Sequence, residues 1–239
     1  IGSYLKSNPN ALSEFTIATK ASITSDADGN RIFDNSAEHL ETELDKSLQR
    51  LGVECVDLFY AHRLDPLLTP EETVANLSRL VKKGKTKAIG LSEVAPSTLR
   101  RAMKTYPIAA VQSEYSLSTR FPDLGLLQTC AELGVAPVAF SPLGRSLRTN
   151  NPIPRERILT LPFLAGNPRF IEPNLTENLR ITDGFRNLAK EMGASAAGLA
   201  NAWLLTRGSH VLPIPGTRSV EHFRESMSGA SLILSETDL

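Results

Sequence analysis

Two residues able to carry charge or move a proton stand at the ends of short apolar runs in this chain. Lys20 ends the segment 15–20, and His62 directly follows the segment 56–61. Such runs, bounded by turn residues, are typical of strands in a parallel sheet. The carboxyl ends of these strands hold the chemistry of α/β proteins, because the loops there converge on one crevice. Lys20 and His62 are therefore candidates for one active site. A solvated lysine and a histidine satisfied by Asp65 or a backbone group are the structural alternatives.

Polar or turn-forming residues also follow the other predicted strands. They are Ser92 and Glu93 after segment 86–91, Gln112 after 108–111, Ser141 after 135–140, and Gly216, Thr217 and Arg218 after 210–214. If all six ends faced one pocket, the sheet would be a closed barrel. In a doubly wound sheet, polar residues are needed only at the ends of the strands beside the switch point, so this fold is the alternative to the barrel.

Helical patterns fill the intervals between these strands. They cover 36–52, 69–83, 96–103, 124–133, 174–192, 195–206 and 219–227, while 25–35 reads as a polar loop and 146–173 as a long irregular segment. Strict alternation of strand and helix predicts a parallel sheet with right-handed crossovers. No Gly-x-Gly-x-x-Gly follows any strand, so the Rossmann fingerprint is missing. We expect an α/β fold, a (β/α)8 TIM barrel formed by 1–239 as a single domain.

Composition narrows the class of protein. The 239 residues carry 26 Lys+Arg and 26 Asp+Glu, with 41% hydrophobic and 22% charged residues. A zero net charge gives no attraction to nucleic acid or an anionic membrane, and no apolar run approaches 18 residues. Cys55 and Cys130 both lie beside apolar residues and are interpreted as core residues of a protein from a reducing compartment. We expect a cytoplasmic protein with a small-molecule substrate and leave the oligomeric state open.

Five motifs in order resemble one known family over essentially the whole chain. They are the segments 56–62 (VDLFYAH), 90–93 (GLSE), 112–117 (QSEYSL), 140–145 (FSPLGR) and 214–218 (IPGTR). This series resembles the aldo-keto reductases, which are NADPH-dependent enzymes on a (β/α)8 barrel. The residues of the second and third motifs are similar to those of the branch that includes fungal pyridoxal reductases and their bacterial relatives. The resemblance implies reduction of an aldehyde or ketone to an alcohol with NADP(H) as cofactor.

The same resemblance implies roles for the first two residues. The family uses a tyrosine as proton donor, assisted by lysine, aspartate and histidine. A free phenol has a pKa of about 10, and a nearby ammonium lowers it toward neutrality. Lys20 matches that lysine, and His62 matches the histidine that hydrogen-bonds the carbonyl oxygen. His39 and His210 are interpreted as structural or solvated.

Cofactor contacts are implied for the remaining motif residues. Ser92, Glu93 and Gln112 match positions that hold the nicotinamide carboxamide, and Glu93 stands where the family often has Asn. Phe140 matches the ring that stacks on the nicotinamide. The residues Ser141, Pro142, Leu143, Gly144 and Arg145 match the loop over the pyrophosphate. The 2′-phosphate site is matched by Gly216, Thr217 and Arg218, and the adenine end by His222, Glu225 and Ser226, where Ser226 replaces the usual Asn. No metal site is expected.

The family's catalytic tyrosine and aspartate are expected upstream of Ile1, together with the first two barrel strands. Only six strand–helix units are visible, and six strands of eight would leave long unpaired edges. We therefore expect the sequence to be an incomplete record of a longer protein. Two other functions stay open: an NADPH-binding regulatory module with little turnover, as in potassium-channel β-subunits, and a barrel of another class such as a phosphate-site lyase.

Overall fold

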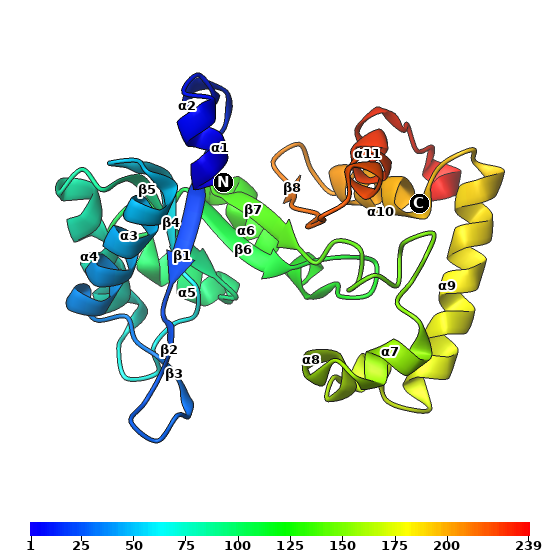
Figure 1. The fold of residues 1–239 in the computed structure, drawn as a ribbon, viewed down its shortest axis with the longest axis horizontal. Coiled ribbons are helices and arrows are strands. Elements are labelled where there is room, and N and C mark those ends of the chain that lie inside the picture. The colour runs from blue at the N-terminus through cyan, green and yellow to red at the C-terminus, as the bar shows by residue number, and fades with distance from the viewer. The chain divides into compact units, whose positions relative to one another are not determined.

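A computed structural model describes all residues 1–239 and divides them into two compact units (Figure 1). Unit 1 comprises Ile1–Ser113 and Gly125–Pro137, and unit 2 comprises Glu114–Leu124 and Val138–Leu239. The boundary passes through two strands, β6 (Ala110–Glu114) and β7 (Ala136–Phe140). Each unit has buried apolar clusters of its own.

Unit 1 contains most of the parallel sheet. Its further elements are α1 (Gly2–Ser7), α2 (Ala11–Glu14), β1 (Ala18–Ala21), β2 (Ile23–Ser25), β3 (Arg31–Phe33), α3 (Ala37–Leu51), β4 (Val56–Ala61), α4 (Pro70–Lys82), β5 (Thr86–Ser92), α5 (Pro96–Ala102) and α6 (Leu126–Leu133). Strands β1, β4, β5 and β6 pair in parallel in that order, with Lys20 opposite Tyr60 and Ser92 opposite Gln112. This register aligns the carboxyl ends of all four strands.

Unit 2 is mainly helical. It contains η1 (Phe121–Asp123), α7 (Arg155–Leu159), α8 (Pro162–Ala165), η2 (Pro168–Phe170), α9 (Asn174–Glu191), α10 (Ala196–Leu205), β8 (Leu212–Pro213), α11 (Val220–Ser228), η3 (Gly229–Ser231) and η4 (Glu236–Asp238). Strand β8 pairs in parallel with β7, Val138 lying opposite Leu212. The sheet as a whole has six strands in the order β1-β4-β5-β6-β7-β8.

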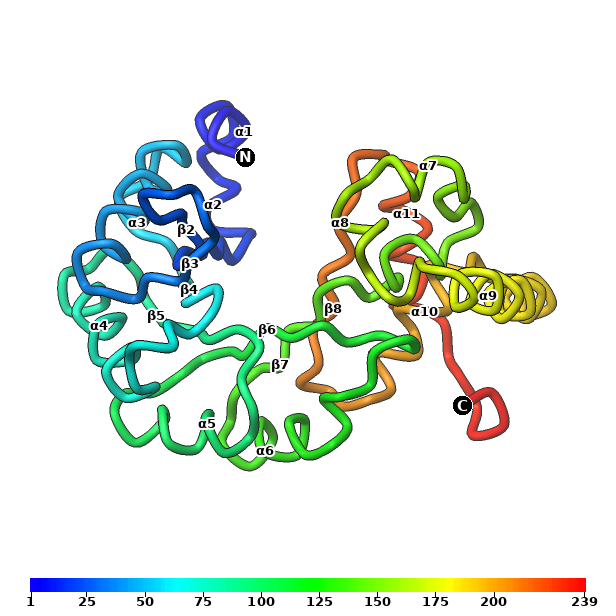
Figure 2. Tube along the Cα trace, turned by 90° about the horizontal axis from the view of Figure 1, so that it is seen from below, coloured from blue at the N-terminus to red at the C-terminus, as the bar shows by residue number.

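The helices of unit 1 begin and end where capping chemistry predicts. Ser36 caps α3 by accepting the His39 amide at 3.2 Å, and Gly52 ends this helix with a φ of +72°. Thr69 and Glu72 form a reciprocal capping box at the start of α4. Figure 2 shows α3, α4, α5 and α6 following one another around the outside of the unit 1 strands.

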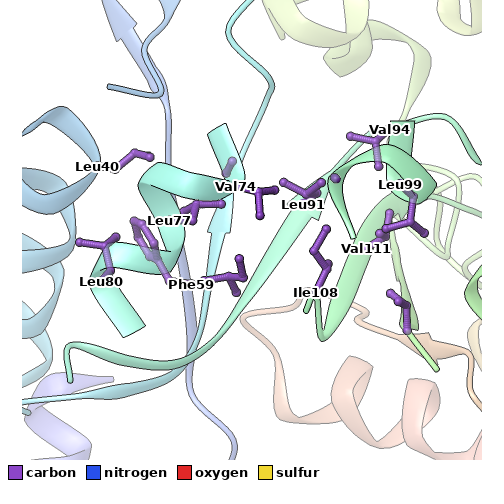
Figure 3. Close-up of a cluster of buried hydrophobic side chains, with 14 of the residues drawn as sticks. Leu40, Phe59, Val74, Leu77, Leu80, Leu91, Val94, Leu99, Ile108 and Val111 are labelled. Carbon is purple, nitrogen blue, oxygen red and sulfur yellow. The ribbon is translucent and has the colours of Figure 1, made fainter. Parts of the chain in front are cut away.

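The core of unit 1 lies between these helices and the sheet. Leu40 and Leu44 of α3 and Leu77 of α4 are fully buried against Phe59 of β4. Figure 3 shows this cluster continuing to Leu99 of α5. Burial of each leucine contributes roughly 1.5–3 kcal/mol to stability. The helices therefore fix the strands whose ends carry the candidate site.

Three segments differ from the sequence-based expectation. Segment 25–35, expected to be a polar loop, contributes to an antiparallel hairpin of β2 and β3, which Asp26 closes by accepting the Asn30 amide at 2.8 Å. Segment 146–173 is not wholly irregular, because α7, α8 and η2 lie within it. Strand β8 is only two residues long, and its Pro213 lacks the amide that would extend the ladder. None of the helices combines the length and apolar character needed to span a membrane.

Candidate active site

The strand ends of unit 1 bring four predicted site residues to the same edge of the sheet. The Lys20 amine donates to Gln112 Oε1 at 2.8 Å, across the ends of β4 and β5. The His62 amide donates to the Ala21 carbonyl at 2.7 Å, so His62 lies one residue past the β1–β4 ladder. Ser92, buried at the end of β5, is opposite Gln112. Lys20 and His62 are therefore neighbours at one rim.

Tyr60 joins this group, although sequence reasoning did not single it out. Gln112 hydrogen-bonds the Tyr60 hydroxyl and also accepts the Lys20 amine, so one amide spans both groups. Burial raises the pKa of Tyr60 to about 12, and the phenol stays protonated at neutral pH. The alternation of side chains along β4 places residues 60 and 62 on one face, which is the signal that could have identified Tyr60.

Gly90 makes room for the Tyr60 ring. A Cβ at residue 90 would lie 2.4 Å from Cδ1 and Cε1 of that ring and 3.0 Å from the Ala110 carbonyl oxygen. Real Cβ contacts are not this close, so the ring crosses β5 only because residue 90 lacks a side chain. The glycine thus permits the contact between Tyr60 and Gln112.

Burial and nearby positive charges keep the imidazole of His62 neutral. Burial, followed by the neighbouring positive charges of Lys20, Arg63 and Arg31, lowers the pKa of His62 to about 4. A neutral imidazole has one N–H donor and one acceptor nitrogen. Partial burial and Arg63 also lower the pKa of Lys20. The group can therefore offer a neutral hydrogen-bond donor beside an ammonium.

A buried polar network supports the backbone of His62. Ser22 Oγ accepts the His62 amide at 3.0 Å and the Asn35 Nδ2 group at 2.7 Å. Asn35 Oδ1 in turn accepts the Asp65 amide at 2.8 Å. Ser22 is fully buried at a φ of +138°, a strained conformation for a serine. Asp65, the alternative partner of His62 in the sequence analysis, accepts the Leu67 amide at 2.8 Å.

Ser92 and Glu93 leave the sheet through a tight turn. The Glu93 amide donates to the Gln112 carbonyl at 2.9 Å, while its φ of +55° lies in the left-handed region. Asn adopts this region more readily than Glu, because its short side chain hydrogen-bonds locally. Ser92 Oγ accepts Nη1 of Arg63 at 3.5 Å. The predicted carboxamide contact of these two residues stays a prediction.

Unit 2 contains a cavity of about 530 Å³ at the ends of β7 and β8. Most predicted cofactor residues of this unit line it, namely Phe140, Ser141, Pro142, Leu143, Arg145, Gly216, Thr217, His222, Glu225 and Ser226. Ile214 and Pro215 of the motif 214–218 also line it, together with residues that sequence reasoning did not assign to the cofactor, namely Ser146, Thr149, Asn151, Ile153 and Ala197. Gly144 and Arg218 are not among the lining residues. The volume is in the range of roughly 300–1,000 Å³ that ligand pockets occupy.

The loop after β7 has an unusual backbone. Ser141, Gly144, Arg145 and Ser146 all have φ values between +51° and +78°. Such residues wind the chain tightly and can form concave arrays of amides that attract anions. Non-glycine residues in this region cost of order 1–3 kcal/mol each, and this strain concentrates at functional sites. The loop therefore suits a phosphate-bearing ligand.

Arg145 is held by a carboxylate of the same unit. Its Nη2 lies 3.1 Å from Oε2 of Glu114, whose other oxygen lies 3.2 Å from Nη1 of Arg169. Burial raises the pKa of Glu114, but the two guanidinium groups outweigh it and lower the pKa overall. Glu114 therefore remains ionised and anchors the loop after β7 to the segment after α8.

The start of α11 borders the cavity. Ser219 caps this helix by accepting the His222 amide at 3.3 Å, and Thr217 Oγ1 accepts the Ser219 amide at 3.1 Å. A helix N-terminus carries partial positive charge, which favours phosphate. Arg218 is exposed beside this cap, and Glu225 accepts Nδ2 of Asn150 at 3.0 Å. The donors around α11 thus fit the phosphate and base of a nucleotide.

Comparisons with known proteins identify the family of the chain. The family model described as "Aldo/keto reductase family" matches residues 1–239. "Probable aldo-keto reductase 1" of Glycine max is 40% identical over 239 residues, covering 100% of this chain and 68% of the relative. "Aldo-keto reductase str7" of Strobilurus tenacellus is 36% identical over 242 residues, covering 100% of this chain and 70% of the relative.

Solved structures place the fold in the same group. A glycerol dehydrogenase from Gluconobacter oxydans superposes with a TM-score of 0.85 at 24% identity, covering 100% of this chain and 73% of that one. A thermostable aldo-keto reductase crystallised with the inhibitor epalrestat gives a TM-score of 0.74 at 27% identity, covering 99% and 73%. The α/β fold is therefore that of the aldo-keto reductase TIM barrels. Together with the family match over residues 1–239, this shows that the chain belongs to the aldo/keto reductase family of oxidoreductases.

Proposed function

We propose that the protein reduces an aldehyde or ketone to an alcohol, with NADPH as the hydride source. The observation that carries the proposal is the group at the strand ends of unit 1, where Lys20 binds Gln112 and a neutral His62 shares the same rim. A fixed N–H donor beside an ammonium stabilises the negative charge that develops on a carbonyl oxygen during reduction. This is the chemistry that an aldo/keto reductase needs.

Bound NADPH would supply the hydride that adds to the carbonyl carbon. His62 donates its imidazole N–H to the carbonyl oxygen and orients it, because its low pKa keeps the ring neutral but still a donor. Lys20 stabilises the negative charge that develops on the oxygen. Tyr60 does not fit the role of a proton donor, because burial raises its pKa to about 12 and Gln112 holds its hydroxyl.

The residues around the cavity of unit 2 suit NADPH. We assign the Phe140 ring to the face of the nicotinamide and the loop 141–145 to the pyrophosphate. Gly216, Thr217 and Arg218 would hold the 2′-phosphate beside the start of α11, with His222, Glu225 and Ser226 at the adenine end. A guanidinium forms paired, charge-assisted hydrogen bonds with a phosphate, which favours NADPH over NADH.

We assign Ser92, Glu93 and Gln112 to the nicotinamide carboxamide, as the motif implies. Gln112 has a second role in this assignment, because it already spans Lys20 and Tyr60. Its amide would then fix the position of the ammonium as well as the cofactor. A small carbonyl compound is the proposed partner. The free cysteines Cys55 and Cys130 are typical of a reducing compartment, and we propose the cytoplasm.

Stopped-flow oxidation of bound NADPH by a panel of aldehydes tests the proposal. We expect Lys20→Met to lower turnover by about 100-fold or more, the usual contribution of such a group, with little change in NADPH affinity. Lys83→Met is the matched control, because this exposed lysine pairs with Glu41 on the helical side of unit 1. Equal turnover in Lys20→Met and the wild type would refute the role of Lys20.

The same experiment separates the main alternative function. A protein that binds NADPH tightly but is oxidised by no aldehyde in the panel would be a binding module with little turnover. A protein whose mixing with NADPH gives no fluorescence change would use its barrel for another chemistry.

A further inference from the structure

Asn150 connects three elements around the cavity of unit 2. Its Nδ2 group donates to Glu225 Oε1 of α11 at 3.0 Å, and its Oδ1 accepts the Ala196 amide at 2.9 Å. Ala196 is the first residue of α10, and Asn150 lies in the loop that follows β7. Glu225 lines the cavity, as do Thr149 and Asn151 on either side of Asn150. One side chain therefore joins this loop to two helices beside the cavity.

The two contacts fix the orientation of the Asn150 amide. A carboxylate oxygen only accepts hydrogen bonds and a backbone N–H only donates them. The nitrogen of the amide must therefore face Glu225, and its oxygen must face Ala196. That oxygen satisfies one of the amides that the start of a helix leaves without an intrahelical partner. Asn150 thus caps α10 with one atom and holds Glu225 with the other.

The backbone of Glu225 is held by other residues. Ser195 Oγ and Ser228 Oγ both donate to the Glu225 carbonyl, at 3.2 and 2.7 Å. A Cβ at Gly198 would lie 3.1 Å from the same carbonyl oxygen, so α10 and α11 pack closely at this point. The two helices therefore fix the backbone of Glu225, and Asn150 fixes the direction of its carboxylate.

A carboxylate held in this way can recognise a purine base by its donors. Its two oxygens offer about four acceptor sites, so the bond from Asn150 to Oε1 of Glu225 leaves capacity for a ligand. The 6-amino group of adenine is a donor, whereas the 6-oxo group of hypoxanthine is an acceptor that an ionised carboxylate repels. Such discrimination requires a fixed carboxylate, because a mobile one turns away from the wrong base at little cost.

We propose that Asn150 is a positioning residue that directs the Glu225 carboxylate toward the 6-amino group of the cofactor's adenine. It thereby sets the preference of the site for adenine over a 6-oxopurine. This inference rests on the proposed NADPH site and adds to it a residue that determines base specificity.

A pair of cofactors that differ only in the purine base tests the proposal. NADPH and deamino-NADPH, in which hypoxanthine replaces adenine, are compared by fluorescence titration of the wild type and of Asn150→Asp. We expect the wild type to bind NADPH about tenfold more tightly than deamino-NADPH, and Asn150→Asp to reduce this ratio to about twofold or less. The aspartate keeps an acceptor for the Ala196 amide but replaces the donor to Glu225 by a like charge.

Two further variants separate positioning from capping and from charge. Asn150→Ala removes both contacts, so it should lower the ratio and also the melting temperature, whereas Asn150→Asp should melt close to the wild type. Asn187→Asp is the matched control, because Asn187 and Asn150 line a second cavity and the variant adds the same charge there. This control should keep the wild-type ratio.

Glu225→Gln provides an independent readout of direction. The Asn150 donor would hold the oxygen of the new amide, so its NH2 group would face the base. The preference should then invert in favour of deamino-NADPH, and the added Asn150→Ala substitution should abolish the inversion. A preference that does not depend on Asn150 in this background would overturn the proposal.

The remaining outcomes are also decisive. A wild-type ratio retained in Asn150→Asp would mean that Asn150 only caps α10, and the proposal would fail. A similar loss of ratio in Asn187→Asp would assign the effect to added charge and would also refute it. Equal affinity of the wild type for both cofactors would sink the inference but leave the proposed function intact. If the wild type bound neither cofactor, the proposed function would fail and this inference with it.

Discussion

Replacing Asn35 by alanine tests the network that positions His62. The Asn35 side chain is fully buried and makes three hydrogen bonds: to Ser22 Oγ at 2.7 Å, from the Asp65 amide at 2.8 Å and from Thr73 Oγ1 at 3.3 Å. Each such bond contributes roughly 1 kcal/mol, so the sum is about 3 kcal/mol. Loss of the Asn35 amide also removes the donor to Ser22 Oγ, which in turn accepts the His62 amide.

The assay is urea-induced unfolding followed by circular dichroism, with kinetics on the same samples. We expect Asn35→Ala to lower the free energy of unfolding by about 3 kcal/mol and to lower kcat more than it raises KM, because the support of His62 is lost. Asn76→Ala is the matched control, since Asn76 makes a single bond to the Asn35 carbonyl at 2.9 Å and should cost about 1 kcal/mol.

Equal losses for Asn35→Ala and Asn76→Ala would refute this reasoning. It would mean that the side chain of Asn35 contributes no more to the free energy of unfolding than the single hydrogen bond of Asn76 does. A large loss of stability with unchanged kcat would keep the network as a structural feature but remove its link to His62. The two readouts therefore separate folding from positioning.

Three further predictions follow from the same structure. The pKa of His62 is lowered from 6.5 to about 4, so in this range the folded state binds fewer protons than the unfolded state. The free energy of unfolding should therefore fall as the pH decreases from about 6.5 to 4. The variant His62→Gln should lose this pH dependence in urea titrations, and a pH profile equal to that of the wild type would contradict the prediction. Arg218→Met should raise KM for NADPH by about tenfold or more and leave KM for NADH unchanged in initial-rate assays; equal effects on both cofactors would count against a 2′-phosphate contact. Gly90→Ala should lower the free energy of unfolding by about 1–3 kcal/mol, because its Cβ would overlap the Tyr60 ring at 2.4 Å. The double variant with Tyr60→Ala should lose less free energy of unfolding than the two single variants lose in sum. Strict additivity of the two losses would refute the overlap.

The positions of Lys20, His62, Ser92 and Gln112 could be predicted because they depend on local patterns. Each follows a short apolar run, and parallel strands with right-handed crossovers bring their carboxyl ends to one edge. The pairing of Lys20 opposite Tyr60 and Ser92 opposite Gln112 agrees with that expectation. The capped helices were equally accessible, since Ser36 and Thr69 act through neighbours three residues away.

Other parts of the site escaped prediction because their partners are distant in sequence. Tyr60 reaches Gln112 over about fifty positions, and the contact depends on a glycine in the strand between them. Asn35 supports His62 through Ser22 and lies in the irregular segment after β3, where sequence patterns give no contacts. Polar hairpins such as β2–β3 give weak signals, because no apolar alternation marks their strands.

By itself the amino-acid sequence determined the parallel α/β organisation, the family resemblance and the residues that end each strand, because periodicity, capping and motif order are all local properties. Only the tertiary structure decided which of those residues contact one another and what charge surrounds them. The neutral imidazole of His62 arises from burial and from Lys20, Arg63 and Arg31, which come from three separate segments. Electrostatic effects depend on distance and burial in space, and neither quantity is written in the order of residues.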